Sequence, residues 1–178
     1  MKPVDSQSEA MEYYEYSAKT GDSSALLLLA QLYYFGTDVM EPDLGKARHF
    51  FEEATKYGND AAYGFLGMIY YRGEGVTVDY ERAKLYFSIA SERNVATGIN
   101  GLGLLYWHGH GVEKDLDAAE ILFKRASDLK YAEAFFNHAM VLLEQSSLFT
   151  SEKIFQGILT ASKAGKVFYF QKTDLEIS

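Results

Sequence analysis

A pattern of eleven residues recurs along this chain at a nearly constant interval, and it constrains the fold more than any other feature of the sequence. It occupies residues 66–76 as LGMIYYRGEGV and returns 36 residues later, in residues 102–112, as LGLLYWHGHGV. A more divergent copy, LAQLYYFGTDV, fills residues 29–39. Repetition with a period of about 20 to 50 residues is typical of stacked structural units, each of which buries its core against its neighbours. The sequence therefore predicts a repeat protein.

A second segment follows each copy of this pattern and repeats with the same period. It begins with Asp79 and carries Ala83, Phe87 and Ala90 at positions i, i+4 and i+7, so these three side chains share one stripe of a helix. The aspartate is well placed to cap this helix, because its side chain can accept a bond from a free backbone N–H of the first turn. The same set recurs 36 residues before and after, as Asp43, Ala47, Phe51 and Ala54 and as Asp115, Ala119, Phe123 and Ala126.

The segment before each loop is expected to be helical as well. Ala62, Leu66 and Tyr70 lie at positions i, i+4 and i+8 of one helical face. Gly67 and its counterpart Gly103 lie inside this helix, where glycine costs roughly 1 kcal/mol relative to alanine. We therefore expect a neighbouring helix to approach closely at these glycines. One unit thus comprises helix A, a loop, helix B and a short turn, with packing roles for the repeated tyrosines Tyr33, Tyr70 and Tyr106.

Glycines mark the ends of both helices. Gly73 and Gly75 follow helix A and allow the positive φ of a left-handed cap and turn. In the first copy Asp38, which tolerates this conformation better than most residues, replaces the second glycine. The turn after helix B carries Gly21, Gly58, Asn94 and Lys130. Lysine does not fit the preference for glycine or asparagine, so we expect the last turn to be built differently.

These patterns predict one all-α repeat domain, a solenoid of helix pairs with about nine helices, over residues 1–178. Its predicted parts are an N-terminal capping helix at 8–20, repeats at 24–58, 61–94 and 97–130, a degenerate repeat at 133–165 and a C-terminal tail at 166–178. The tail has a composition typical of strands, yet the chain offers it no partner strand. We expect it to lie extended over the last repeat, with a short helix as the alternative.

In combination, these residues resemble the Sel-1-like repeat, an α/α unit related to the tetratricopeptide repeat, over roughly residues 8–165. The tetratricopeptide repeat itself has a period of about 34 residues and lacks the Gly-x-Gly-Val loop. The resemblance implies a right-handed α/α superhelix whose A helices line a concave face. It also implies adaptor roles, in quality control or signalling complexes of eukaryotes or in envelope, motility and host-interaction functions of bacteria, and it implies no chemistry.

Cysteine usage sets this chain apart from some secreted bacterial members of that family, which carry a cysteine pair in each repeat. The chain has no cysteine, so nothing in it argues for an oxidising compartment. No signal peptide or transmembrane run is visible, which favours a cytoplasmic protein. A processed chain from the periplasm or a secreted protein would have the same features.

Composition and charge limit the classes of partner. The 48% hydrophobic content argues against disorder. A formal net charge of −8 argues against nucleic acid, which requires a basic footprint, and against an anionic membrane surface. Partners with basic or apolar surfaces are more compatible.

Candidate metal and catalytic residues are few. The four histidines are His49, His108, His110 and His138. Without cysteine, and with two of the four in separate repeats, they are interpreted as ordinary loop and helix residues and not as a zinc site. No Gly-x-Ser-x-Gly motif or other nucleophile–base set is present. The Gly-x-Gly pairs follow helices and lack a third glycine, so they do not predict a dinucleotide site.

Aromatic residues provide the candidate binding surface. Tyr34, Tyr71 and Trp107 come one place after the repeated tyrosine, so stacking would place them in a row near the end of helix A. Two interpretations stay open: these rings fill the space under the loops, or they are anchors on a binding face, where such residue types are enriched. Phe35, Arg72 and His108 follow them in the chain, and helix phase adds Gln31, Tyr63, Met68, Asn100 and Leu104.

The sequence therefore predicts a non-enzymatic scaffold or adaptor without a cofactor, which binds a peptide or partner protein in the concave groove that the resemblance implies. A structural or self-assembling repeat protein is the alternative, and an enzyme or metal-binding protein is the least favoured hypothesis. The oligomeric state stays open, with a monomer slightly preferred.

Overall fold

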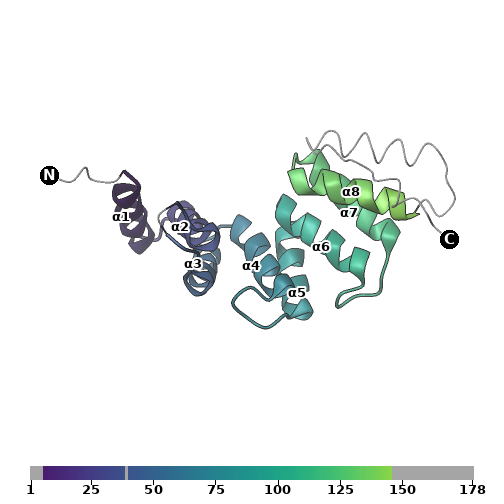
Figure 1. Cartoon of the computed structure of the whole chain (residues 1–178), viewed down its shortest axis with the longest axis horizontal. Coiled ribbons are helices and arrows are strands. Elements are labelled where there is room, and N and C mark those ends of the chain that lie inside the picture. Colours follow the sequence, from purple (N-terminus) through teal and green to yellow (C-terminus); the bar gives the residue numbers. More distant parts are fainter. Residues whose placement is uncertain (1–5, 39, 146–178) are drawn as a thin grey trace.

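The computed structural model describes residues 6–38 and 40–145. Over this part the chain forms eight α-helices and no strand, arranged one after another along the long axis of the molecule (Figure 1). The helices are α1 Ser6–Lys19, α2 Ser23–Phe35, α3 Leu44–Lys56, α4 Ala61–Arg72, α5 Tyr80–Glu92, α6 Ala96–His108, α7 Leu116–Asp128 and α8 Ala132–Gln145.

The helices pack as antiparallel pairs that stack in chain order. Helix A packs against helix B within each unit, as α2 on α3, α4 on α5 and α6 on α7, and each helix B also contacts the helix A that follows it. This arrangement confirms the predicted all-α solenoid. α1 packs on α2, and α8 packs on α7 in the position of a fourth helix A. The predicted second helix of the fourth unit and the tail at 166–178 lie outside the described residues.

The predicted aspartate caps are present at the start of all three B helices. The side-chain oxygens of Asp43, Asp79 and Asp115 each accept a hydrogen bond of 2.9 Å from a backbone N–H three residues later. These bonds satisfy donors that the first helical turn leaves free. At the other end of helix A, Gly73 and Gly109 have φ values of 70° and 69°, the left-handed caps expected from the sequence.

The core of each unit is a phenylalanine of helix B. Phe51, Phe87 and Phe123 are fully buried. A Cβ atom added to either Gly67 or Gly101 would lie 2.3 Å from a ring carbon of Phe87, so this ring is held between α4 and α6. Gly67 is therefore needed because an aromatic ring lies on it, which explains the close approach that the sequence predicts.

The position through which the next unit meets this phenylalanine at the first two junctions carries a different residue in each unit. Phe65, Gly101 and Asn137 occupy equivalent positions 36 residues apart. At the first junction the ring of Phe65 stacks on Phe51 at 4.7 Å, whereas at the second the bare backbone of Gly101 meets Phe87. Consistent with this difference, α4 and α6 pack directly on each other, and α2 and α4 lack such an extensive contact.

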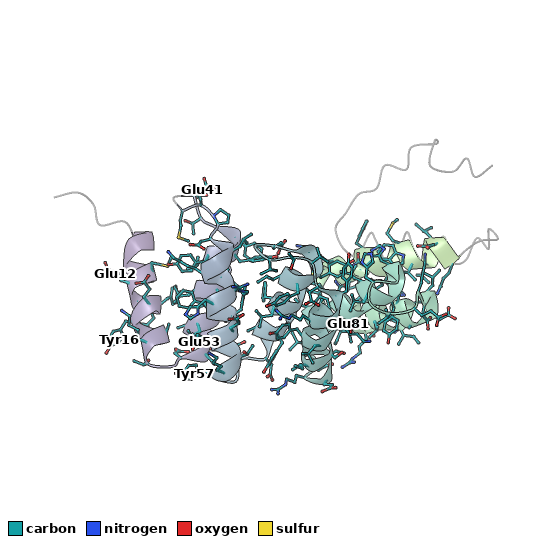
Figure 2. All side chains as sticks on the ribbon, turned by 90° about the horizontal axis from the view of Figure 1, so that it is seen from below. Glu12, Tyr16, Glu41, Glu53, Tyr57 and Glu81 are labelled. Carbon is teal, nitrogen blue, oxygen red and sulfur yellow. The ribbon has the colours of Figure 1, made fainter. Side chains whose placement is uncertain are left out.

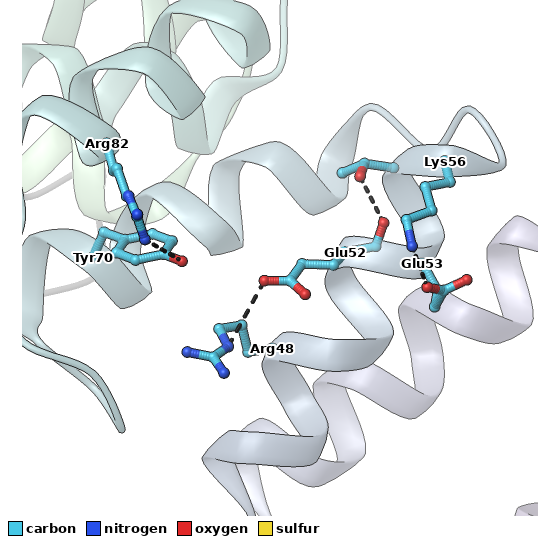
Figure 3. A network of polar contacts seen from close by, with 7 residues as sticks. Arg48, Glu52, Glu53, Lys56, Tyr70 and Arg82 are labelled. Atoms are coloured by element: carbon cyan, nitrogen blue, oxygen red, sulfur yellow. Dashed lines mark hydrogen bonds and ion pairs between the residues drawn. The ribbon is translucent and has the colours of Figure 1, made fainter.

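The repeated tyrosines form a second layer between the helices of a unit. Tyr33 stacks on Phe50, and Tyr70 stacks on Tyr86, both with ring centroids 5.6 Å apart. A cation lies over each tyrosine ring: Lys46 at 4.9 Å from Tyr33, and Arg82 at 5.2 Å from Tyr70. Figure 3 shows the second pair, in which Arg82 also donates a hydrogen bond to the Tyr70 hydroxyl.

Two sequence expectations about turns are wrong. Lys130 has a φ of 66° and so adopts the same left-handed conformation as Gly21, Gly58 and Asn94 at the equivalent turns. The last turn is thus built like the others, because the stacking of the next helix fixes the backbone there. Asp38 does not share the positive φ of Gly75 and Gly111. The first loop is one residue longer and is closed instead by an isolated bridge between Thr37 and Met40.

None of the helices in the described part of the chain is both long and apolar enough to cross a membrane.

The packing of Phe87 predicts opposite changes in the free energy of unfolding for two glycine-to-alanine substitutions. Gly101→Ala is expected to lower the free energy of unfolding by about 1–3 kcal/mol, because the new methyl group would overlap the buried ring. Gly45→Ala, in the exposed first turn of α3, meets no close neighbour except an oxygen 3.4 Å away and is expected to raise it by up to about 1 kcal/mol. Chemical denaturation measures both, and a stabilised Gly101→Ala variant would contradict this packing.

The left-handed backbone conformation of Lys130 can be tested by substitution. Lys130→Gly is expected to stabilise the fold by about 1 kcal/mol, because a side chain disfavours this backbone conformation and glycine does not. Lys130→Ala keeps a Cβ atom and serves as the matched control, so its melting temperature should stay near that of the wild type. A gain of equal size in both variants would show that the lysine side chain, and not the backbone conformation, is responsible.

Candidate functional site

Tyr34, Tyr71 and Trp107 hold equivalent positions near the ends of α2, α4 and α6, and we call these three residues the aromatic row. All three are half-buried. Each ring packs against the core phenylalanine of its own unit, with centroid distances of 6.1 Å to Phe51, 6.3 Å to Phe87 and 5.8 Å to Phe123 respectively. The rings thus fill space under the loops, which is one of the two interpretations that the sequence left open.

Each member of the aromatic row also reaches the following unit. The Tyr34 hydroxyl donates a hydrogen bond to the Glu74 carboxylate, and burial together with this carboxylate raises the pKa of Tyr34 to about 12. The Tyr71 ring lies 5.7 Å from the ring of His110. The aromatic row therefore links neighbouring repeats as well as helices within a repeat.

Trp107 makes the most polar of these links. Its indole Nε1–H donates to Glu144 at 2.6 Å, and Lys114 Nζ donates to the other carboxylate oxygen at 2.7 Å. The two hydrogen bonds, that from Lys114 first, lower the pKa of Glu144. An open depression of about 1040 Å³ adjoins this carboxylate, and its wall carries charges of both signs, including Lys84, Lys114, Asp117 and Glu144.

One exposed residue follows each member of the aromatic row, namely Phe35, Arg72 and His108. Phe35 is 65% exposed, and its ring meets that of Tyr34 edge-on at 4.8 Å. Arg72 pairs with Glu74 at 3.4 Å. His108 stacks on Trp107 with ring centroids 4.7 Å apart. Together with the aromatic row, these three residues form a line along the ends of the A helices, which we call the A-end line.

The remaining sequence candidates are distributed over other surfaces. Met68 and Leu104 hold equivalent positions on α4 and α6, and both are half-buried against the core clusters of their units. Tyr63 lies elsewhere, with its ring 6.3 Å from that of Tyr86 and the guanidinium of Arg93 5.5 Å above it. Helix phase placed all of these on one face; the ring of Tyr63 contacts Tyr86 and Arg93, whereas Met68 and Leu104 pack against core clusters.

Asn100 and Gln31 complete the set suggested by helix phase. Asn100 is only 3% exposed and accepts a hydrogen bond of 2.9 Å from Asn137, so its side chain offers no surface to a partner. Gln31 is half-buried at the position equivalent to Met68. Glu74 and Glu144 were not predictable from the sequence, because their roles depend on contacts between repeats that no local spacing reveals.

The histidines do not converge. Among the described residues, no three histidine, aspartate or glutamate side chains lie together as a metal-binding set. The rings of His108 and His110 are 5.4 Å apart, and His110 stacks on Tyr80 at 4.4 Å. His49 contacts Phe50 on α3, and His138 is half-buried on α8. The site thus combines aromatic, cationic and imidazole side chains.

Sequence comparison identifies one family. A profile of the Sel1 repeat matches residues 2–22, 23–59, 60–95 and 96–131. No curated protein matches the chain.

Three solved structures resemble this fold. The Sel1 repeat protein from Oxalobacter formigenes has a TM-score of 0.75 and 20% identity, with 90% of this chain and 63% of that chain covered. A protective antigen of uropathogenic Escherichia coli strains, which displays an SLR fold, has a TM-score of 0.69 and 25% identity, with coverage of 87% and 32%. The cysteine rich protein B of Helicobacter pylori has a TM-score of 0.52 and 24% identity, with coverage of 71% and 90%. The chain spans less than two thirds of the length of the first two proteins.

The imidazole pair in this site generates a titration test. Partial burial, and then the neighbouring His110, lower the pKa of His108 below its usual value of 6.5. In an NMR titration we expect the His108 ring to have a midpoint below 6.5, and His110→Asn to raise that midpoint because a like charge is removed. Because the pKa of His108 is lower in the folded chain, the unfolded chain binds the proton more readily. As pH falls from 6.5 towards the folded-state pKa, protonation of His108 therefore lowers the free energy of unfolding. A wild-type midpoint at or above 6.5 would contradict the combined effect of partial desolvation and His110 on this ring.

Proposed function

The chain belongs to the Sel1 repeat family, and from this membership we propose that it is a non-enzymatic scaffold that binds another protein along its A helices. Sel1 repeats generally serve as protein–protein interaction scaffolds. A stack of helix pairs supports such a role because it exposes one long surface of equivalent positions, whose residues can vary while the core stays the same.

The A-end line is the observation that carries this proposal. In three consecutive units a half-buried ring is fixed by the core, and the residue beside it is exposed and differs between units, as Phe35, Arg72 and His108. Tyrosine, tryptophan and arginine are the residue types most enriched at interaction hot spots, which lie in rigid, partly desolvated surroundings. Rings held by Phe51, Phe87 and Phe123 meet this requirement, because little side-chain entropy is left to lose on binding.

The charge of the chain supports a partner with a basic or apolar surface. The formal net charge is −8, and electrostatic complementarity steers association towards cationic surfaces. Within the A-end line, Phe35 offers apolar area, and the neighbouring Glu74 carboxylate, which contacts Tyr34 and Arg72, offers a hydrogen-bond acceptor. We propose a protein or peptide that lies across the ends of the A helices and spans at least two repeats.

The experiment starts from a partner captured with the purified chain, identified and then purified for titration. A triple variant, Phe35→Ala with Arg72→Ala and His108→Ala, removes only exposed side chains and is expected to weaken binding by about tenfold or more. The matched control is Leu85→Ala with Ile121→Ala, since these exposed apolar residues hold equivalent positions on α5 and α7, away from the A-end line. Circular dichroism verifies that both variants are folded.

The two variants distinguish the surfaces of the stack. Unchanged affinity of the triple variant, together with loss in the control, would place the partner on the B helices and contradict the proposal. A stable dimer of the purified chain that is lost in the control variant would instead support the self-assembling alternative.

A further inference from the structure

Two of the three repeated tyrosines are covered by a cation of their own unit. Lys46 lies 4.9 Å from the ring of Tyr33, and Arg82 lies 5.2 Å from the ring of Tyr70 (Figure 3). Each cation comes from the first turn of helix B and also pairs with the aspartate that caps this helix, at 3.7 Å in the first unit and 3.3 Å in the second. The cation is thus held between a tyrosine ring and a carboxylate.

The third unit has the ring and the carboxylate but not the cation. Tyr106 and Asp115 hold the equivalent positions, and Ala118 replaces the lysine or arginine. In the part of the chain that the structure describes, no cation lies over the ring of Tyr106. Consistent with this difference, Tyr106 is half-buried, whereas its two counterparts are buried. The third unit also has Leu122 at the position from which an aromatic ring stacks on the tyrosine in the first two units.

The backbone holds the tyrosine and the aspartate in the same relation in all three units. The N–H of the capping aspartate donates to the tyrosine carbonyl at 2.7 Å in the first unit, 2.9 Å in the second and 3.0 Å in the third. One side-chain oxygen of Asp115 caps α7 through the backbone N–H of Ala118. The other oxygen is the one that pairs with the cation in the first two units. Both halves of a cation site are therefore retained in the third unit.

Tyr106 and Asp115 both line the open depression of about 1040 Å³ that adjoins Glu144. Val112 and Leu116 give its wall an apolar part. The charged groups of the wall are four carboxylates and two lysines, namely Glu113, Asp115, Asp117, Glu144, Lys84 and Lys114. The excess of carboxylates favours a positively charged occupant.

Two of these carboxylates already have partners within the described chain. Glu144 pairs with Lys114 at 2.7 Å, and Asp117 accepts a hydrogen bond of 3.0 Å from Gln145. The counterpart of Asp117 is Glu81, at the start of α5 (Figure 2). The carboxylate of Asp115 therefore differs from its neighbours, because its partner in the first two units is a cation that the third unit lacks.

We propose that this depression, which we call the Tyr106 site, binds an arginine or lysine side chain of the partner protein. The cation lies over the Tyr106 ring and beside the Asp115 carboxylate, as Arg82 lies over Tyr70. The ring attracts the cation through its quadrupole, and the carboxylate accepts charge-assisted hydrogen bonds from it. The chain itself thus shows which chemical group fits.

The Tyr106 site rests on the proposed function, since it assumes a protein partner, and it names one side chain that this partner carries. It adjoins the A-end line, because Glu144 belongs to its wall and also accepts the hydrogen bond of Trp107. A segment that follows the A-end line to the third unit can therefore place a basic residue in the Tyr106 site.

The probe is a pentapeptide with a central arginine between two leucines and a glycine at each end. It is titrated into the isotope-labelled full chain and followed by NMR. We expect saturable shifts of the Tyr106 ring and the Asp115 amide, and none at Tyr33 and Tyr70, because Lys46 and Arg82 already fill those places. A control peptide with citrulline instead of arginine keeps the shape without the charge and should bind about tenfold more weakly.

Two substitutions at one surface position test the occupant. Ala118→Arg supplies the cation from the chain itself, as Arg82 does in the second unit, and is expected to abolish saturable binding of the peptide. Ala118→Gln is the matched control, since its side chain is long but uncharged, and it should bind the peptide within about threefold of the wild type. Circular dichroism verifies that both variants are folded.

The carboxylate is tested by a substitution that keeps the helix cap. Asp115→Asn removes the charge, whereas asparagine caps a helix about as well as aspartate, so binding is expected to weaken about fivefold without loss of the fold. Asp79→Asn makes the same change at the equivalent cap of the second unit, outside the Tyr106 site, and should leave the affinity for the peptide unchanged.

Three results would overturn the proposal. Equal affinity for the arginine and citrulline peptides would show that no cation is recognised. Unchanged binding to Ala118→Arg would place the peptide elsewhere. Absence of saturable shifts at Tyr106 in the wild type would show that the site does not accept a basic side chain, whether or not another part of this chain covers it. Because the peptide replaces the partner, each of these results leaves the A-end line to be judged by its own triple variant.

Discussion

The burial of one phenylalanine of helix B in each unit is the interaction on which this stack depends most. Phe87 lies on Gly67 of its own helix A and on Gly101 of the next, so a single ring supports both the fold of a unit and its junction with the following one. Phe51 and Phe123 are buried to the same extent. Truncating a ring of this kind typically costs about 3–5 kcal/mol, and here the loss would fall on two interfaces at once. The repeating motif is therefore explained by packing before any function is considered.

The junctions between units differ because the position equivalent to Gly101 carries a different residue in each unit. The ring of Phe65 stacks on Phe51 and the bare backbone of Gly101 meets Phe87, whereas the third unit has Asn137 at the equivalent position. Each choice changes the spacing or polarity of its junction, and Asn137 adds a buried hydrogen bond to Asn100. The shape of the exposed surface thus depends on residues outside the motif. A partner that spans several repeats would sense these differences, since specificity arises from such local departures between otherwise equivalent sites.

Structural roles that depend on neighbours in the sequence were predictable, and roles that depend on contacts with another repeat were not. The caps at Asp79 and Asp115 and the helix ends at Gly73 follow from hydrogen bonding and backbone conformation within a few residues. Lys130 adopts a left-handed conformation against its preference because the turn is fixed by the helices on either side. Helix phase gives a direction around an axis but not the neighbour that covers it, which is why Asn100 is buried and Tyr63 lies beside Arg93. The links of the aromatic row to Glu74 and Glu144 depend on tertiary contacts that local spacing does not reveal.

The central claim is that the partner contacts the positions that vary between units at the ends of the A helices, while the repeated positions hold the fold. Hydrogen–deuterium exchange of the chain, alone and with its purified partner, tests this most directly. The account predicts added protection that recurs at intervals of about 36 residues, around Phe35, Arg72 and His108 and in the loops that follow them. Protection confined to the outer faces of α5 and α7, around Leu85 and Ile121, with none at the ends of α2, α4 and α6, would contradict it.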